Sequence, residues 1–198
     1  MRTSILIPTL IAVVLAGCGD RPPATPVAPV PLPEAGAPTP AADVGMLPAA
    51  DTITFAGFGP AAFGADEEGV RMAWGKDMEG APSEPGGCYV LVPAPRGESP
   101  LRLGFMLEGG KFSRIDVRID AITAPGGGKV GMSADEVARL YPGAEVVAHK
   151  YVEGARTLRA KDPAGGTGAL VFETDAKSVV TAWRIGVPPQ VDYVESCG

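Results

Sequence analysis

The sequence contains no asparagine, one glutamine (Gln190) and one histidine (His149). A single histidine excludes metal sites with several histidine ligands and most histidine-based catalysis. The lack of asparagine removes an amide donor that many sugar-binding sites use. Aromatic residues make up only 6% of the chain, whereas 27 of the 198 residues are glycine and 21 are proline. This composition predicts short helices and strands separated by many turns.

The motifs of common enzyme classes are also missing. No Gly-x-Ser-x-Gly nucleophile turn occurs. The glycine-rich run at residues 126–129 lacks the earlier glycine of a phosphate-binding loop, and Val130 replaces its hydroxyl residue. The acidic residues 66–68 could bind a cation, but their place at the start of a predicted helix is explained by the helix dipole. We therefore expect a non-enzymatic protein with no metal and no cofactor.

Residues 1–17 have the pattern of an export signal. Arg2 precedes an apolar run at residues 5–15 that is too short to span a bilayer as a mature helix. The tetrapeptide at residues 15–18, Leu-Ala-Gly-Cys, resembles the bacterial lipobox, which implies cleavage before Cys18 and lipidation of its thiol. By the same resemblance, Gly19 after the lipidated cysteine favours the outer membrane. An ordinary secretory signal with an incidental cysteine is the alternative.

The residues after Cys18 predict a tether followed by the folded part. Residues 18–48 are rich in proline, alanine and valine and poor in charge, as in extended spacers. Loss of Arg2 with the signal would change the formal net charge from −6 to about −7. An acidic chain of this kind is not expected to bind nucleic acid or anionic lipid.

Two cysteines, Cys88 and Cys197, remain once Cys18 is assigned to the lipid. In an oxidising envelope, two such thiols are expected to form a disulfide. The bridge would close a loop long enough to stabilise the fold by about 4–5 kcal/mol on the chain-entropy model. Neither cysteine has a candidate base nearby in the sequence, so a catalytic thiol is not expected.

The stretch at residues 130–143 predicts a short helix and contains signals for both its start and its end. Ser133 and Glu136 have the spacing of a capping box, and Pro142 with Gly143 ends the helix. The residues that would face the core, at i, i+3 and i+4, are Val137, Leu140 and Tyr141.

A similar helix, at about residues 66–74, precedes this one by 67 residues. Matched pairs at this separation are Gly64 with Gly131 (131 − 64), Val70 with Val137 (137 − 70) and Trp74 with Tyr141 (141 − 74). Several matches in order at one offset indicate an internal duplication. We predict two tandem repeats, at residues 49–121 and 122–198.

Each helix is followed by segments with the patterns of β-strands. The predicted strands are at 53–55, 88–92, 101–107, 112–120, 146–152, 156–160, 169–173 and 178–185, with an edge strand at 191–194. In the strand at 112–120, one face would hold Ser113, Ile115, Val117 and Ile119 and the other Phe112, Arg114, Asp116, Arg118 and Asp120. The predicted fold is α+β, in which each repeat packs a short helix on one face of an antiparallel meander.

The helix opening Gly-Met-Ser-x-x-Glu-Val at residues 131–137, and its earlier counterpart, are similar to the fold shared by the bacterial β-lactamase-inhibitor protein and small outer-membrane assembly lipoproteins. Residues 130–141, 149–152, 170–175 and 191–197 resemble a group of uncharacterised Gram-negative envelope lipoproteins, some of them automatically labelled lectins. The resemblance implies a lipid-anchored protein of the outer membrane, with its folded part in the periplasm or at the cell surface. It brings no catalytic or binding residue with it.

If the helices cover one face of the sheet and nothing covers the other, the open face can hold a partner. The residues predicted to bind the partner there are Arg114, Asp116, Arg118, Arg184, Tyr89 and Tyr151, with apolar contact from Phe112 and Val180. Arginine and tyrosine are favoured at interfaces, and by resemblance the inhibitor protein holds a protein on such a face. We predict a binding protein whose macromolecular partner is a protein. The alternatives are a lectin-like protein that stacks sugars on Trp74, Trp183 or its tyrosines, and a structural or assembly lipoprotein.

Overall fold

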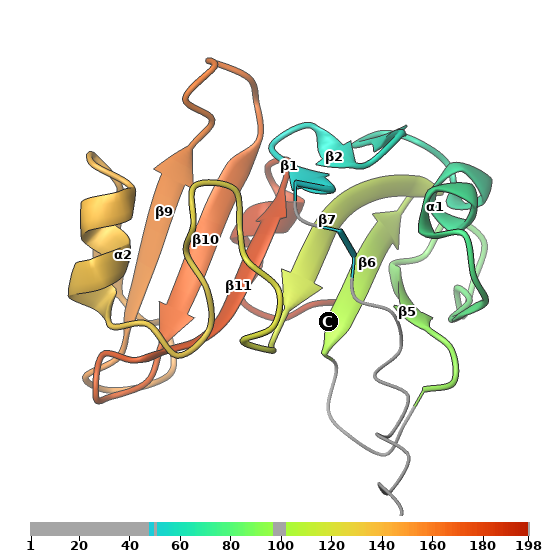
Figure 1. Ribbon diagram of the computed structural model, residues 1–198. Helices are drawn as coiled ribbons and strands as arrows, with labels where there is room; N and C mark the ends of the chain where they lie inside the picture. Colours follow the sequence, from blue (N-terminus) through green and yellow to red (C-terminus); the bar gives the residue numbers. More distant parts are fainter. Residues whose placement is uncertain (1–47, 50, 97–101, 198) are drawn as a thin grey trace, which may run out of the picture. The chain divides into compact units, whose positions relative to one another are not determined.

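The computed structural model describes residues 48–49, 51–96 and 102–197, all within one compact unit at residues 41–198 (Figure 1). The predicted export signal, the predicted lipidation site Cys18 and nearly all of the predicted tether lie outside these described residues. Within the unit, two short helices accompany antiparallel sheets, so the α+β class is confirmed.

An eight-stranded antiparallel sheet forms the centre of the unit, in the order β4-β5-β6-β7-β11-β10-β9-β8. Its strands are β4 (Met78–Glu79), β5 (Tyr89–Pro93), β6 (Leu103–Glu108), β7 (Lys111–Val117), β8 (Glu145–Ala148), β9 (Arg156–Lys161), β10 (Ala169–Thr174) and β11 (Val180–Gly186). Strands β4 to β7 make one meander and strands β8 to β11 make another. Antiparallel pairing of β7 with β11 joins the two meanders.

One helix precedes each meander in the chain. Helix α1 (Glu67–Trp74) begins after Asp66, whose side chain accepts a hydrogen bond from the Gly69 N–H, and it ends at Gly75 in the left-handed conformation. Helix α2 (Ala134–Leu140) begins with the predicted Ser133–Glu136 capping box, which is confirmed. Both helices are therefore where the sequence predicts them.

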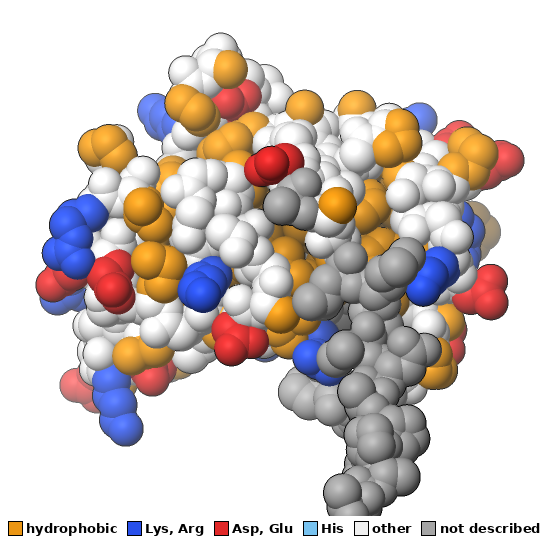
Figure 2. All heavy atoms as spheres, viewed as in Figure 1, with side chains coloured by type: hydrophobic (Ala, Val, Ile, Leu, Met, Phe, Trp, Pro, Cys, Tyr) orange, Lys and Arg blue, Asp and Glu red, His pale blue; other side chains and the backbone are white. Residues whose placement is uncertain are grey.

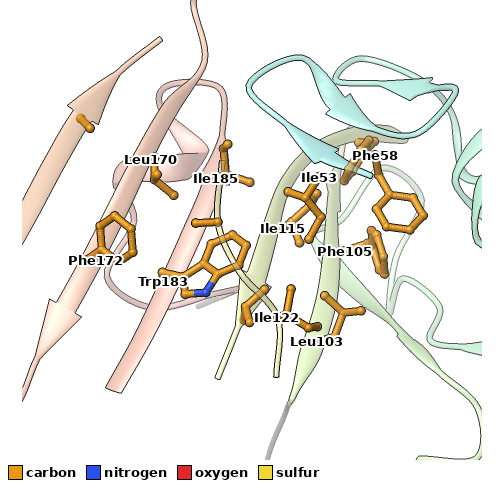
Figure 3. Packing of buried hydrophobic residues seen from close by; sticks show 14 of the residues in the cluster. Ile53, Phe58, Leu103, Phe105, Ile115, Ile122, Leu170, Phe172, Trp183 and Ile185 are labelled. Carbon is orange, nitrogen blue, oxygen red and sulfur yellow. The ribbon is translucent and has the colours of Figure 1, made fainter. Parts of the chain in front are cut away.

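The helices and a small three-stranded sheet cover the same face of the large sheet. The small sheet contains β1 (Ile53–Thr54), β2 (Gly57–Phe58) and β3 (Ala61–Ala62). Ile53 and Phe58 lie over Ile115 and Phe105 in Figure 3, and the rings of Phe58 and Phe105 meet edge to face at 5.0 Å. Apolar side chains from both helices, both sheets and both meanders form a single core.

One row of this core runs across the large sheet from neighbour to neighbour. Its members in register are Leu103, Val117, Trp183, Phe172, Leu158 and Val146, on β6, β7, β11, β10, β9 and β8. All are buried except Val146, which is 47% exposed at the outer edge. The core row thus reaches the surface at β8.

Two β-bulges change the direction of side chains in β7 and β11 from the one that strict alternation predicts. The register of β6 with β7 shifts between Met106 and Leu107, and that of β10 with β11 shifts between Glu173 and Thr174. The extra residues are Ser113 in β7 and Thr181 in β11. They turn Phe112 and Val180 into the core, so placing these two side chains on the opposite face was wrong. Strict alternation fails at these points because a bulge opposes two residues to one.

The chain leading into each helix is hydrogen-bonded to one of these bulges. The Gly64 N–H donates to the Phe112 carbonyl at 2.7 Å, and the Gly131 N–H donates to the Val180 carbonyl at 2.9 Å. Each helix is thereby held against the strand that carries the bulge in its own half of the chain.

The other face of the large sheet is covered by the C-terminal segment, residues 187–197, which passes behind the sheet in Figure 1. Within it, the 3₁₀ turn η1 (Gln190–Asp192) buries Val191 against Ala169 and Val171. The predicted edge strand at 191–194 is therefore wrong. The predicted disulfide is confirmed: Cys88 and Cys197 are bonded and hold the segment to the start of β5.

Candidate binding surface

Arg114 lies beneath the C-terminal segment rather than on an open face. Its guanidinium binds the Asp116 carboxylate, with Nη2 2.7 Å from Oδ1 and Nε 2.9 Å from Oδ2. Its Nη1 donates to the main-chain carbonyls of Gln190 at 2.9 Å and Tyr193 at 2.8 Å. Arg114 is 2% exposed and Asp116 is 6% exposed. The donors and acceptors of this buried pair are thus largely used within the chain.

Arg184, on the neighbouring strand β11, has a similar arrangement. Its Nε donates to the Val191 carbonyl at 2.6 Å, and its Nη1 forms an ion pair with Glu173. The second carboxylate oxygen of Glu173 lies 3.9 Å from Nε2 of His149. Arg184 is 4% exposed. A second arginine therefore holds the same segment by its main chain.

These contacts correct the prediction that Arg114, Asp116 and Arg184 bind a partner on an open sheet face. The face is closed by residues 187–197, which supply the carbonyl groups that both guanidinium groups need once they are removed from water. Further contacts attach the segment at its sides: Gln190 to Glu108 at 2.7 Å, and Arg159 to Asp192 at 2.7 Å. The apolar contact predicted there from Phe112 and Val180 is absent as well, because both lie in the core on the other face.

Tyr89 is on the helix-covered face, not on the predicted binding face. It is buried, and its hydroxyl donates to Glu67 of α1 at 2.7 Å. Burial and the hydrogen bond to Glu67 raise the pKa of Tyr89 to about 12, while the same hydrogen bond lowers the pKa of Glu67. Arg71 also binds Glu67 and donates to the Met78 carbonyl. Tyr89 thus fastens α1 to the sheet, and its prediction as a contact residue was wrong.

The two remaining predicted contact residues, Arg118 and Tyr151, are exposed but are not on one surface with the others. Arg118 follows the end of β7. Tyr151 is 55% exposed in the loop after β8, and its hydroxyl donates to Glu195 at 2.6 Å. The Nζ of Lys150 lies 4.7 Å from the centre of the Tyr151 ring, and a side-chain hydrogen bond with Tyr151 raises the pKa of Lys150. Of the six predicted residues, Tyr151 is the one in the loop that follows β8.

Strand β8 is the free edge that the sequence analysis did not identify as a site. It ends the sheet on one side, and the strand at the other end, β4, has only two residues. The His149 N–H donates to the Ala155 carbonyl, so odd-numbered residues here direct their main-chain groups toward β9. By the alternation of an antiparallel ladder, the N–H and C=O groups of Val146 and Ala148 point away from the sheet. The edge therefore presents four main-chain hydrogen-bonding groups to the outside.

Three of the four side chains of this edge are apolar, and they are exposed on both faces. All four β8 residues are exposed, including Val146 and Val147 at 47% each. A shallow hollow beside the β8–β9 hairpin is lined by Val146, Val147, Ala148, Gly154, Ala155 and Arg156. The sequence signal was present: Val146 and Val147 are adjacent, so a strand there must direct one valine to each face.

By contrast, the side of the unit seen in Figure 2 has positive, negative and apolar side chains interspersed among its coloured atoms, with no large patch of one kind. Within the described ranges, no group of three or more His, Cys, Asp or Glu side chains is arranged to hold a metal ion. No helix among the described residues is long and apolar enough to cross a membrane.

Comparisons with known proteins identify no family for the chain. No family model matches it, and no curated protein matches it. Among solved structures, it is similar to an extracellular protein containing a SCP domain from Bacillus anthracis str. Ames, with 12% sequence identity and a TM-score of 0.41. The match covers 63% of this chain and 44% of that one. A likeness of this size establishes neither a shared family nor a shared function.

Proposed function

We propose that this protein is a non-enzymatic, lipid-anchored envelope protein that binds a protein partner along the free edge of β8. The observation that carries the proposal is that Val146 and Ala148 direct unused main-chain groups outward while apolar side chains on both faces of the strand are exposed. The proposed binding surface is therefore the sheet edge and not the sheet face, because the chain itself covers that face.

Strand addition is the mode of binding that fits such an edge. An extended segment that pairs with a sheet edge gains main-chain hydrogen bonds, and its alternate side chains meet the neighbouring side chains of the edge strand. Proteins that must avoid this pairing protect their edge strands with lysine, proline, bulges or very short strands. Strand β4 is protected by its length of two residues. Strand β8 has four residues and contains no lysine, proline or bulge; its one charged side chain is Glu145, at its first position.

We also propose that the unit arose from two tandem repeats, at residues 49–121 and 122–198. Both halves have a helix, then a four-stranded meander with a bulge, and the two register shifts are 67 residues apart (173 − 106). The hydrogen bonds from Gly64 and Gly131 to the bulges add a third correspondence, with the donors 67 residues apart (131 − 64) and the acceptors Phe112 and Val180 68 apart (180 − 112). This arrangement would agree with the resemblance to the β-lactamase-inhibitor fold. It would also make β8 (Glu145–Ala148) the longer counterpart of β4 (Met78–Glu79), at the same separation (145 − 78).

The location follows from the sequence, and it remains part of the proposal. Cys18 after a short export signal would carry the lipid, with the outer membrane as its destination. The disulfide between Cys88 and Cys197 supports an oxidising compartment. Metabolic labelling with palmitate tests the anchor: label should enter the wild-type chain and be absent from the Cys18→Ser variant. Equal labelling of both chains would refute it.

Sugar binding is the second candidate function, and one observation favours it. A hollow lies between the C-terminal segment and the β8–β9 loop, lined by Lys150, Asp192, Tyr193, Val194, Glu195 and Ser196. Tyr151 and Tyr193 are exposed nearby, and tyrosine rings with carboxylates are suited to sugar rings and hydroxyls. Trp183, in contrast, is buried in the core and cannot stack on a sugar.

In-cell photo-cross-linking with the full-length chain tests the proposed protein partner. Benzoylphenylalanine at position 147 should give a cross-linked adduct with another protein, because Val147 is exposed beside the edge. The same probe at position 72 is the matched control, because Met72 is 70% exposed but lies on α1. Adducts at position 147 should be absent at position 72.

A second change links the adduct to strand pairing. Val146→Pro removes an outward N–H and leaves the β8–β9 ladder intact, because the inward bonds belong to the odd-numbered residues. It should strongly reduce the adduct at position 147, whereas Val146→Thr, which keeps the N–H, should not. Equal adducts at positions 72 and 147, or adducts insensitive to Val146→Pro, would refute the edge as the binding surface.

A further inference from the structure

We infer that the partner strand added to β8 carries an apolar residue opposite Val146 and a basic residue opposite Glu145. This inference rests on the proposed function and specifies the chemistry of the partner. It follows from what the two faces of the sheet present at the edge, where each cross-strand row ends without a neighbour.

On the helix-covered face, the row that ends at Val146 is the core row. Val146 pairs with Leu158, which pairs with Phe172, and both of these are buried. An apolar side chain opposite Val146 would extend this row by one place and remove Val146 from water. Burial of apolar area contributes about 25 cal/mol per Å², so this position favours valine, isoleucine or leucine in the added strand.

On the other face, the neighbouring row ends at an acidic residue. Glu145 pairs with Arg159, but Arg159 already binds Asp192 through Nε at 2.7 Å. The pKa of Arg159 is raised, mainly by its hydrogen bond to Asp192 and less by the charge of Glu145. The outer side of Glu145 is exposed. Opposite charges on directly paired residues stabilise a sheet, whereas like charges destabilise it. A lysine or arginine therefore fits the place opposite Glu145.

Two segments of this chain could in principle pair with the edge of β8: the β8 strand of a second copy, and the predicted tether. Charge and composition exclude both. A second copy pairing through its own β8 cannot supply the cation, because residues 144–149 read Ala-Glu-Val-Val-Ala-His. The predicted tether at residues 18–48 has one basic residue, Arg21, and two prolines follow it directly. Proline lacks the N–H that pairing requires. The fitting occupant is an extended segment of a different protein.

The register gives a short pattern for this segment. In antiparallel addition, successive partner residues lie opposite Val147, Val146 and Glu145, so the pattern is two apolar residues followed by a basic one. The residue opposite Val146 would exchange both main-chain hydrogen bonds with it, as in a hydrogen-bonded pair of an antiparallel ladder.

Two labelled peptides test the pattern by fluorescence anisotropy with the purified lipidated chain in detergent. One is acetyl-Thr-Thr-Val-Val-Lys-Thr-Thr-amide, and the other has glutamate in place of lysine. The wild-type chain should bind the lysine peptide about three- to tenfold more tightly, as expected for exchanging an attractive for a repulsive cross-strand pair. The Glu145→Lys variant should reverse this preference, and Val146→Pro should abolish binding of both peptides.

The outcomes separate this inference from the proposed function. Equal binding of both peptides, lost in Val146→Pro, would overturn the charge pattern but support β8 as the edge that binds. Absence of binding by either peptide would overturn the pattern, and the cross-linking at position 147 would then decide on the edge independently. A dimer in sedimentation that Val146→Pro dissociates would overturn the inference, because a second copy would then occupy the edge. Thermal unfolding of each variant shows whether it is folded.

Discussion

The Nη1 of Arg114 donates a 2.8 Å hydrogen bond to the carbonyl oxygen of Tyr193, 79 residues later in the chain. The same guanidinium binds Asp116, so one buried side chain neutralises a carboxylate and holds the segment that covers it. Recognition through a main-chain carbonyl does not depend on the side chain at position 193. The contact therefore has a structural role. It holds residues 187–197 over this face of the sheet, so a partner cannot bind there.

We expect Arg114→Met to lower the free energy of unfolding by about 3–5 kcal/mol, because it leaves the buried Asp116 carboxylate without its partner. Urea unfolding followed by circular dichroism measures this loss. The double variant Arg114→Met with Asp116→Leu should recover a large part of it, since replacing a buried pair by apolar groups is often close to neutral. If the double variant were as unstable as the sum of both single variants, the pair would not act as a unit.

Breaking the disulfide should destabilise the fold without unfolding the strands first. Cys88 and Cys197 are separated by 109 positions, and the chain-entropy model assigns a loop of this length about 4–5 kcal/mol. The double variant Cys88→Ala with Cys197→Ala should lose stability of this order in urea unfolding. Its amide hydrogen exchange should rise in residues 190–197 before it rises in β7 and β11. Exchange that rises equally in all three would contradict a locally released segment.

Tyr89→Phe should lower stability by about 1 kcal/mol at neutral pH, because it removes a hydrogen bond to a charged group that is partly exposed. Its effect should depend on pH in two windows. Since the pKa of Glu67 is lowered, its contribution is present above its ordinary value of 4.5 and is lost as the pH falls below it.

At the alkaline end, the pKa of Tyr89 is raised from 10.0 to about 12, so its contribution is complete below pH 10 and is lost as the pH approaches 12. Unfolding free energies of wild type and Tyr89→Phe measured across the pH range give both windows. The difference between the two proteins should shrink at both ends. A difference that stays constant with pH would show that the hydroxyl bond to Glu67 does not influence either pKa.

Ser133→Ala should cost about 1 kcal/mol by removing the hydroxyl half of the capping box, in which the Glu136 N–H donates to Oγ of Ser133. Ser133→Thr keeps a hydroxyl at the same place and is the matched control, with an expected cost of a few tenths of this. Thermal unfolding compares the two variants. An equally large loss with threonine would assign the effect to packing and not to the cap.

Local patterns sufficed to predict both helices, most of the strands and the disulfide, because caps, alternation and cysteine count are written in neighbouring residues. The two bulges could not be predicted this way. An extra residue such as Ser113 changes the face of Phe112 without any change in the alternating pattern around it. The predicted strand at 146–152 also stops early, because Nδ1 of His149 accepts the N–H groups of Tyr151 and Val152 and bends the chain.

The candidate site was mislocated for a different physical reason. Arginines that alternate with apolar residues resemble a solvated face, and their true acceptors are main-chain carbonyls that every sequence contains. Nothing in the order of side chains shows that residues 187–197 return across the sheet. Val191, the one apolar residue that this return buries completely, is indistinguishable in the sequence from a residue of an edge strand.

The position of the covering segment in the chain has a consequence for biosynthesis. Every strand of the large sheet is made before Val191, so the ribosome completes β11 while Arg114 and Arg184 still lack their carbonyl acceptors. A chain that lacked residues 187–197 would still contain every strand of the large sheet, but Arg114 and Arg184 would lack these carbonyl acceptors and Cys88 would lack its partner thiol. A premature stop codon before this segment would therefore leave a chain with all of its strands but an uncovered sheet face.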